Sequence, residues 1–190
     1  MKGFHSSTSP STATNKQLIE NGISRSKALS LYRDGQYAEA EVVFLKSIQK
    51  KIITNGEQSQ DVALVRSDLA DLYLDMGRLK EAQSLLEDAE RVRRSGIVSD
   101  LACTRDNLGR TYEMQEEYEQ AIKWRTMGAP NEMVCSHLEC PKMINAAKLS
   151  KYVELQHCAR CKCVFYCNAA CQKKDWKRHK KYCKAPGPAV

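Results

Sequence analysis

The chain has 190 residues, and its 30 Lys and Arg against 23 Asp and Glu give a formal net charge of +7. No apolar run approaches the 18 residues of a membrane-spanning helix, and residues 1–20 lack the apolar stretch of a secretory signal peptide. We therefore expect no membrane partner and a cytoplasmic or nuclear location, where the nine cysteines stay reduced and bind metal in preference to forming disulfides.

Residues 1–15 are rich in Ser and Thr and poor in apolar side chains, a composition that predicts a disordered tail. Residues 16–127 follow with a helical pattern and no proline. Within them, three stretches repeat one pattern: 28–40 (ALSLYRDGQYAEA), 70–82 (ADLYLDMGRLKEA) and 109–121 (GRTYEMQEEYEQA). Each copy predicts a helix, a short turn and a second helix.

The conserved positions of the pattern have distinct structural roles. Each copy opens on a small residue, which lets the two helices of a pair approach closely. Gly35 and Gly77 suit the left-handed conformation that ends a helix, whereas the third copy has Glu116 at that place. We expect the second helices to begin at Tyr37, Leu79 and Tyr118.

These repeats resemble the tetratricopeptide repeat over about residues 25–126, in the longer-period form of kinesin-light-chain-like proteins. The resemblance implies a mainly α-helical solenoid of helix-turn-helix units whose groove receives a peptide. An ordinary helical bundle is the alternative. The Gly and Pro in residues 128–134 oppose helix continuation, so this segment is predicted to be a linker.

Residues 135–184 are spaced like a set of metal ligands, and residues 185–190 form a short tail. Cys or His residues a few positions apart can each supply half of a tetrahedral zinc shell. Four such pairs are present: Cys135 and Cys140, Cys158 and Cys161, Cys167 and Cys171, His179 and Cys183. They make two closed Zn²⁺ sites, and a closed site is structural and not catalytic.

The expected helix over residues 171–183 restricts which pairs share an ion. Cys171 and His179 would lie about 12 Å apart along it, whereas zinc bonds to sulfur or nitrogen are only about 2.0–2.3 Å long. An interleaved arrangement is therefore favoured, with the first and third pairs on one ion and the second and fourth pairs on the other. Cys163 is expected to be a free thiol, and Cys103 a buried apolar residue of the repeats.

The spacing from the second pair onward is Cys158-x2-Cys161-x5-Cys167-x3-Cys171-x7-His179-x3-Cys183. With Gln172 and Trp176, it resembles the MYND zinc finger, which implies a two-zinc cross-brace with the same interleaving and a protein-binding role, often for proline-containing peptides. The positions that line the family's peptide groove match Gln172 and Trp176. The first pair departs from the family, with four intervening residues in place of two, so His137 is an alternative ligand to Cys135 or Cys140.

We favour a zinc-binding adaptor, in which the repeat groove and the finger bind proteins and the finger takes a proline-containing peptide. Residues 148–184 hold 11 Lys and Arg but only two acidic residues, so a nucleic-acid-binding or transcription-associated protein is the alternative. A third hypothesis is that the finger only caps the repeats and that Trp176 packs on the zinc core. Enzymatic activity is not expected, since no methyltransferase-like Asn-His-Ser motif and no nucleophile–base pair is found.

Overall fold

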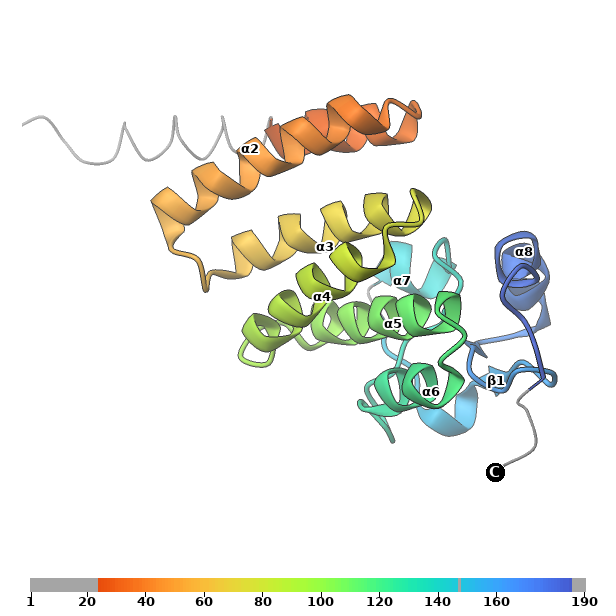
Figure 1. Ribbon diagram of the computed structural model, residues 1–190. Helices are drawn as coiled ribbons and strands as arrows, with labels where there is room; N and C mark the ends of the chain where they lie inside the picture. The colour runs from red at the N-terminus through yellow and green to blue at the C-terminus, as the bar shows by residue number, and fades with distance from the viewer. Residues whose placement is uncertain (1–23, 147, 186–190) are drawn as a thin grey trace, which may run out of the picture.

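The computed structural model describes residues 24–146 and 148–185, so the tail predicted at residues 1–15 lies outside the described residues. Residues 24–33 are helical, and five helices follow: α2 (Tyr37–Asn55), α3 (Gln60–Asp75), α4 (Leu79–Arg93), α5 (Val98–Met114) and α6 (Tyr118–Thr126). They stack in successive helix pairs, and the C-terminal third of the chain lies against the last pair (Figure 1). The predicted mainly α-helical repeat architecture is confirmed.

The turn inside each pair has the same backbone geometry in all three copies. Gly35, Gly77 and Glu116 all adopt the left-handed conformation, with φ of 74°, 75° and 66°. The amide of the next residue then donates to a carbonyl five residues earlier at 2.8–2.9 Å, which caps the first helix. The second helices begin at the predicted residues Tyr37, Leu79 and Tyr118.

The core of the stack consists of small and branched apolar side chains. The small residues that open and close the repeats are fully buried: Ala28, Ala40, Ala70, Ala82 and Ala121. Gly109 allows a close approach, because a Cβ built there would lie 2.5 Å from Cγ of Arg125. In the third pair an arginine side chain therefore occupies the space that the missing side chain leaves.

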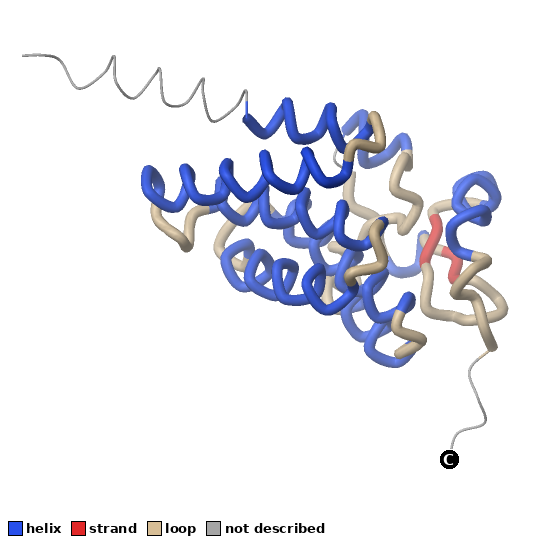
Figure 2. The backbone as a smooth tube through the Cα atoms, turned by 45° about the horizontal axis from the view of Figure 1, so that its top comes forward, coloured by secondary structure: helices blue, strands red, loops and turns tan. Residues whose placement is uncertain are grey.

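The C-terminal third combines short elements with one longer helix. It contains α7 (Pro141–Ala146), the 3-10 helix η1 (Tyr152–Glu154), β1 (Gln156–His157), β2 (Phe165–Tyr166) and α8 (Ala169–His179). The strands pair antiparallel, with Gln156 opposite Tyr166, beside α8 (Figure 2). The segment predicted as a linker is packed at its end, where Met133 pairs with Ser150 and is 1% exposed. Nowhere in the described ranges is there a helix with the length and apolarity to cross a membrane.

Candidate metal centre

One group of four cysteines joins the segment after the repeats to the start of α8. Cys135 and Cys140 precede α7, whereas Cys167 and Cys171 flank the N-terminus of α8. Asn168 caps that helix by accepting from the Cys171 amide at 2.9 Å, which fixes the direction of its first turn. The sulfur of Cys140 lies 3.7 Å from Cys167 and 3.9 Å from Cys171.

A second group of four gathers at the other end of α8. Cys158 and Cys161 lie on the turn between β1 and β2, His179 ends α8, and Cys183 follows it. The Cys158 and Cys183 sulfurs are 3.7 Å apart, and Nε2 of His179 is 3.5 Å from Cys161. All four side chains are buried. The structure thus places the eight residues in the interleaved grouping.

The geometry of both groups fits zinc. A tetrahedral ion with Zn–S bonds of about 2.3 Å sets its sulfur ligands about 3.8 Å apart. The sulfur separations given above match this value, and within each group the potential ligand atoms all lie within 4.8 Å of one another. All nine cysteines are free thiols, so disulfides do not account for the clustering. The donor sets fit two Zn²⁺ ions.

Two neighbours of the clusters stay outside them. His137, the alternative ligand, is not among the four residues of the first group, and its buried Nδ1 has no hydrogen-bond partner. Cys163 is fully buried, and its thiol donates to the sulfur of Cys161 at 3.6 Å. This contact lowers the pKa of Cys161, burial raises it, and a hydrogen bond with His179 lowers it further, to about 3. The low pKa favours the thiolate that a metal needs.

The imidazole of His179 is held by a residue of the helical repeats. Nδ1 of His179 lies 2.6 Å from a carboxylate oxygen of Glu113 on α5, and both side chains are fully buried. Because Nδ1–H donates to the carboxylate, Nε2 is left to face the thiolates of the second group. Carboxylates hold zinc-binding imidazoles in this way, fixing the ring and its tautomer.

Glu113 is itself held by two arginines. Arg125 on α6 donates to it at 2.7 Å, and Arg178 on α8 lies 3.5 Å away. Burial opposes ionisation of Glu113, but Arg125, His179 and Arg178 outweigh it and lower the pKa of the carboxyl to about 2. Glu113 is therefore an ionised carboxylate shared by the last repeat and the finger.

Arg125 connects the same two regions through further hydrogen bonds. It donates to the carboxylate of Asp106 on α5 at 3.1 Å and to the carbonyl of Cys163 in the finger at 2.7 Å. Ser136 also donates to Asp106, at 2.6 Å, and its amide donates to the Phe165 carbonyl at 2.8 Å. This buried polar network, absent from the sequence-based interpretation, fixes the finger on the third repeat.

Cys103 differs from its prediction, because it is half-buried on α5 and faces a small hollow beside Asp106. Burial is the main cause that raises the pKa of its thiol to about 12. The residue therefore stays protonated and lies outside both groups of four.

The two predicted peptide-binding residues share one exposed face of α8. Gln172 and Trp176 line a shallow hollow of about 240 Å³ with Ala169 and Lys173. Trp176 is 42% exposed, and its ring lies 5.8 Å from that of His179. The indole therefore packs on the second metal group with one edge and presents the rest of its surface to solvent.

Fold and site together define a zinc-finger protein with helical repeats. Family models described as tetratricopeptide repeats match residues 21–95 and 99–126, and one described as the MYND finger matches residues 135–183. The chain is thus a MYND-type zinc finger protein with N-terminal tetratricopeptide repeats.

Individual relatives match only parts of the chain. The N-lysine methyltransferase SMYD2-B of Danio rerio is 58% identical to this chain over 31 residues, which are 16% of this chain and 7% of that protein. The SET domain and MYND-type zinc finger protein 6 of Schizosaccharomyces pombe is 54% identical over 33 residues, 17% of this chain and 7% of that protein. The chain thus spans under a tenth of these relatives' length.

A solved structure matches about half of the chain. The crystal structure of BtubC (BKLC) from P. vanneervenii has a TM-score of 0.53 and 25% identity, covering 55% of this chain and 43% of that chain. The family models for the repeats and the finger support a zinc-binding protein-interaction module.

Proposed function

We propose that this protein is a non-enzymatic adaptor whose finger binds an extended, proline-containing peptide through Gln172 and Trp176. In this proposal the eight residues of the two groups hold two structural zinc ions. Four protein ligands per ion leave no position for a substrate or an activated water. The methyltransferase names belong to relatives that this chain matches over the finger alone.

The exposed indole of Trp176 is the observation that carries the proposal. A tryptophan that served only to fill the zinc core would be buried, yet 42% of this residue faces solvent beside a hollow. Its flat apolar surface suits a proline ring, while the Gln172 amide one turn earlier has donors and an acceptor for peptide backbone groups.

The adaptor proposal is tested by titrating proline-containing peptides into the zinc-loaded chain. We expect Trp176→Ala to weaken binding by about tenfold or more, as for an aromatic anchor of an interface, and Gln172→Ala to weaken it less. Val153→Ala, at another exposed apolar side chain of the finger but outside the hollow, is the matched control and should bind like the parent chain. Zinc content and circular dichroism report on folding.

Two results would contradict this proposal. Absence of binding to every proline-containing peptide would remove the assigned ligand class. Loss of zinc from Trp176→Ala would instead assign the indole to the metal core, in agreement with the alternative role of Trp176 as a packing residue.

A further inference from the structure

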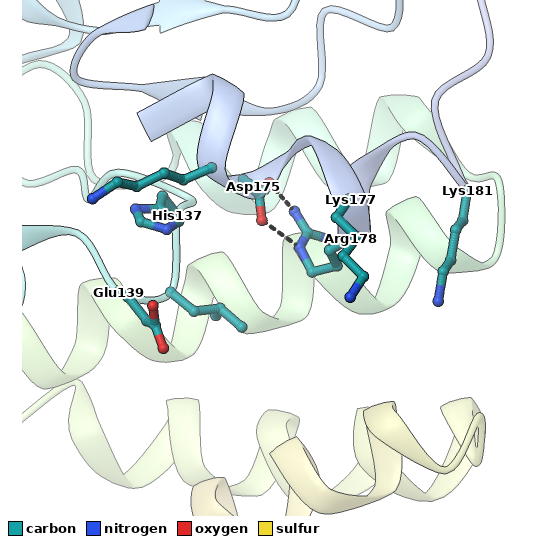
Figure 3. A pocket seen from close by; sticks show the side chains of 8 residues that line it. His137, Glu139, Asp175, Lys177, Arg178 and Lys181 are labelled. Atoms are coloured by element: carbon teal, nitrogen blue, oxygen red, sulfur yellow. Dashed lines mark hydrogen bonds and ion pairs between the residues drawn. The ribbon is translucent and has the colours of Figure 1, made fainter. Parts of the chain in front are cut away.

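A second concave surface lies on the other flank of α8. The loop at residues 137–139 faces one side of this helix across a cleft of about 390 Å³ that extends to Lys181 (Figure 3). Figure 3 shows the Asp175–Arg178 pair inside the cleft, with Lys177 beside it and Lys181 on the segment that follows the helix. The cleft shares no residue with the hollow of Gln172 and Trp176.

Three lysines give this cleft an unbalanced positive charge. Lys174, Lys177 and Lys181 are exposed, and among the described residues none of them forms an ion pair. Arg178 is already engaged, because it donates to Asp175 at 2.6 and 2.7 Å. Glu139 is then the one acidic side chain of the cleft lining without such a partner.

The lysines are arranged in a row. Lys174 and Lys177 lie three positions apart on α8, turned by about 100–160° from Trp176 around the helix axis, and Lys181 follows in the turn after the helix ends at His179. Alternate residues of an extended chain project on one side at intervals of about 6.6 Å. Lysine side chains are long and flexible, so successive ammonium groups of this row can meet side chains at that interval.

We infer that this cleft binds an extended acidic segment of a partner protein, with Asp or Glu at alternate positions facing the lysines. Leu138, 50% exposed at the cleft wall, provides apolar contact for the side chains between them. The site goes beyond the proline-peptide surface and does not depend on it. Opposite charge then adds to the rate and the specificity of partner binding.

Carboxylates spread along a peptide fit the cleft better than phosphate groups do. Recognition of a phosphate typically uses the bidentate fork of an arginine, and the fork of Arg178 is occupied by Asp175. Single-stranded nucleic acid needs aromatic platforms for its bases, and Trp176 lies on the other flank of α8. Glu139 would also repel a continuous phosphate backbone.

The test uses the zinc-loaded full chain and a short fluorescein-labelled peptide in which Glu alternates with Ser. We expect Lys177→Gln/Lys181→Gln to weaken binding by about fivefold or more, in line with the loss of two partly exposed charge pairs. Lys173→Gln/Lys180→Gln is the matched control, since it removes the same charge at two neighbouring positions that do not line the cleft. That control and Trp176→Ala should bind the probe like the parent chain.

Each alternative result has a defined meaning. If both double variants weaken binding equally, the overall positive charge of α8 explains the binding, and the assignment of the acidic peptide to this cleft is wrong. Unchanged binding of a peptide with Gln in place of Glu would contradict the assignment as well. Tighter binding of duplex DNA, with a salt slope that indicates several phosphate contacts, would replace the acidic peptide by nucleic acid as the occupant. Two retained zinc ions in each variant keep these outcomes separate from unfolding.

Discussion

The repeat stack and the finger are held together by different physical means. The stack buries large apolar side chains completely, among them Phe44, Leu72 and Leu86. The buried cluster of the finger contains mostly cysteines, with Val164 and Tyr166 as its large apolar members. A module of this size has too little apolar surface to fold alone without a metal. Apolar burial therefore stabilises the repeat stack, whereas the finger depends on zinc.

The region whose packing involves the zinc finger extends beyond the finger itself into the last helix pair of the repeats. The buried cluster of the finger includes Ala121 of α6, with Tyr112, Tyr118 and Ile122 packed against it. Tyr118 also donates to the carbonyl of Tyr182 at 2.8 Å. Glu113 and Arg125 are paired with finger residues. We therefore expect the stability of the third helix pair to depend on the zinc centre more than on the first two pairs.

Removal of zinc should have the largest effect and would reveal how far this region extends. Structural zinc contributes on the order of 10–16 kcal/mol of apparent binding free energy. We expect a chelator to unfold the finger and to loosen α5 and α6, while residues 24–33 and α2–α4 stay helical. Hydrogen exchange measured by mass spectrometry, combined with circular dichroism, locates the change.

Single ligand variants refine this test. Cys161→Ser and Cys183→Ser should each lose one zinc ion, whereas Cys163→Ser and Cys103→Ser should keep both, as measured by atomic absorption. A Cys163→Ser protein with one zinc ion would disprove the assignment at that turn. Full protection of α5 and α6 after chelation would show that the zinc-dependent region begins only at residue 128.

A cavity in the stack should produce the opposite pattern. Leu72 is fully buried on α3, so Leu72→Ala should reduce the free energy of unfolding by about 2–5 kcal/mol. The finger is spared, because none of its ligands contacts this part of the core. Chemical denaturation measures the loss, and the purified variant should still hold two zinc ions. Release of zinc from the native variant would contradict the separation of the two regions.

The sequence was sufficient for the architecture and for the grouping of the eight Cys and His residues. Repeat length and turn residues determined where each helix begins, and the rise of an α-helix excluded Cys171 and His179 from one ion. Their role as zinc ligands stays a prediction. Residues 141–157, the long insertion after the first cysteine pair, form α7, η1 and β1, which no sequence signal indicated.

The link between repeat and finger was missed, although a signal for it exists. Glu113 occupies the repeat position that Tyr32 and Leu74 hold in the first two copies. Arg125 likewise stands where those copies have Phe44 and Leu86, both fully buried. Two charged residues at core positions of one copy indicate that this copy packs against something other than a further repeat. Their partners lie 38 to 66 residues away along the chain, so only the structure identifies them.

Glu113→Gln tests that link with a smaller effect. The amide retains the shape of the side chain but removes the charge that orients His179 and pairs with Arg125. Loss of a carboxylate that hydrogen-bonds a metal-binding imidazole typically lowers metal affinity by about 10–100-fold, and we expect this loss at one of the two sites. Competition with a chromophoric chelator measures the two affinities. Glu116→Gln, at an exposed acidic position on the turn after the same helix, is the control and should leave both unchanged.

The smallest expected effect concerns the turn of the third copy. Glu116 adopts φ of 66° where the other copies have glycine, and a left-handed conformation costs a residue with a side chain roughly 1–2 kcal/mol. Glu116→Gly should therefore stabilise the repeats, by about 1 kcal/mol once the greater freedom of glycine in the unfolded chain is subtracted. The ion pair of Glu116 with Lys184 is lost, but it is exposed and contributes little.

The reciprocal change makes this last prediction a matched comparison. Gly77 has φ of 75°, and a Cβ built on it meets no atom within 4 Å, so Gly77→Glu introduces the backbone strain without a steric clash. It should lower the free energy of unfolding by about 1 kcal/mol, once the same difference in the freedom of the unfolded chain is subtracted from the strain of that conformation. Lys184→Gln isolates the ion pair and should change stability by less than about 1 kcal/mol. If Glu116→Gly instead destabilises the protein while Lys184→Gln does not, the glutamate stabilises the turn by a contact other than its ion pair with Lys184.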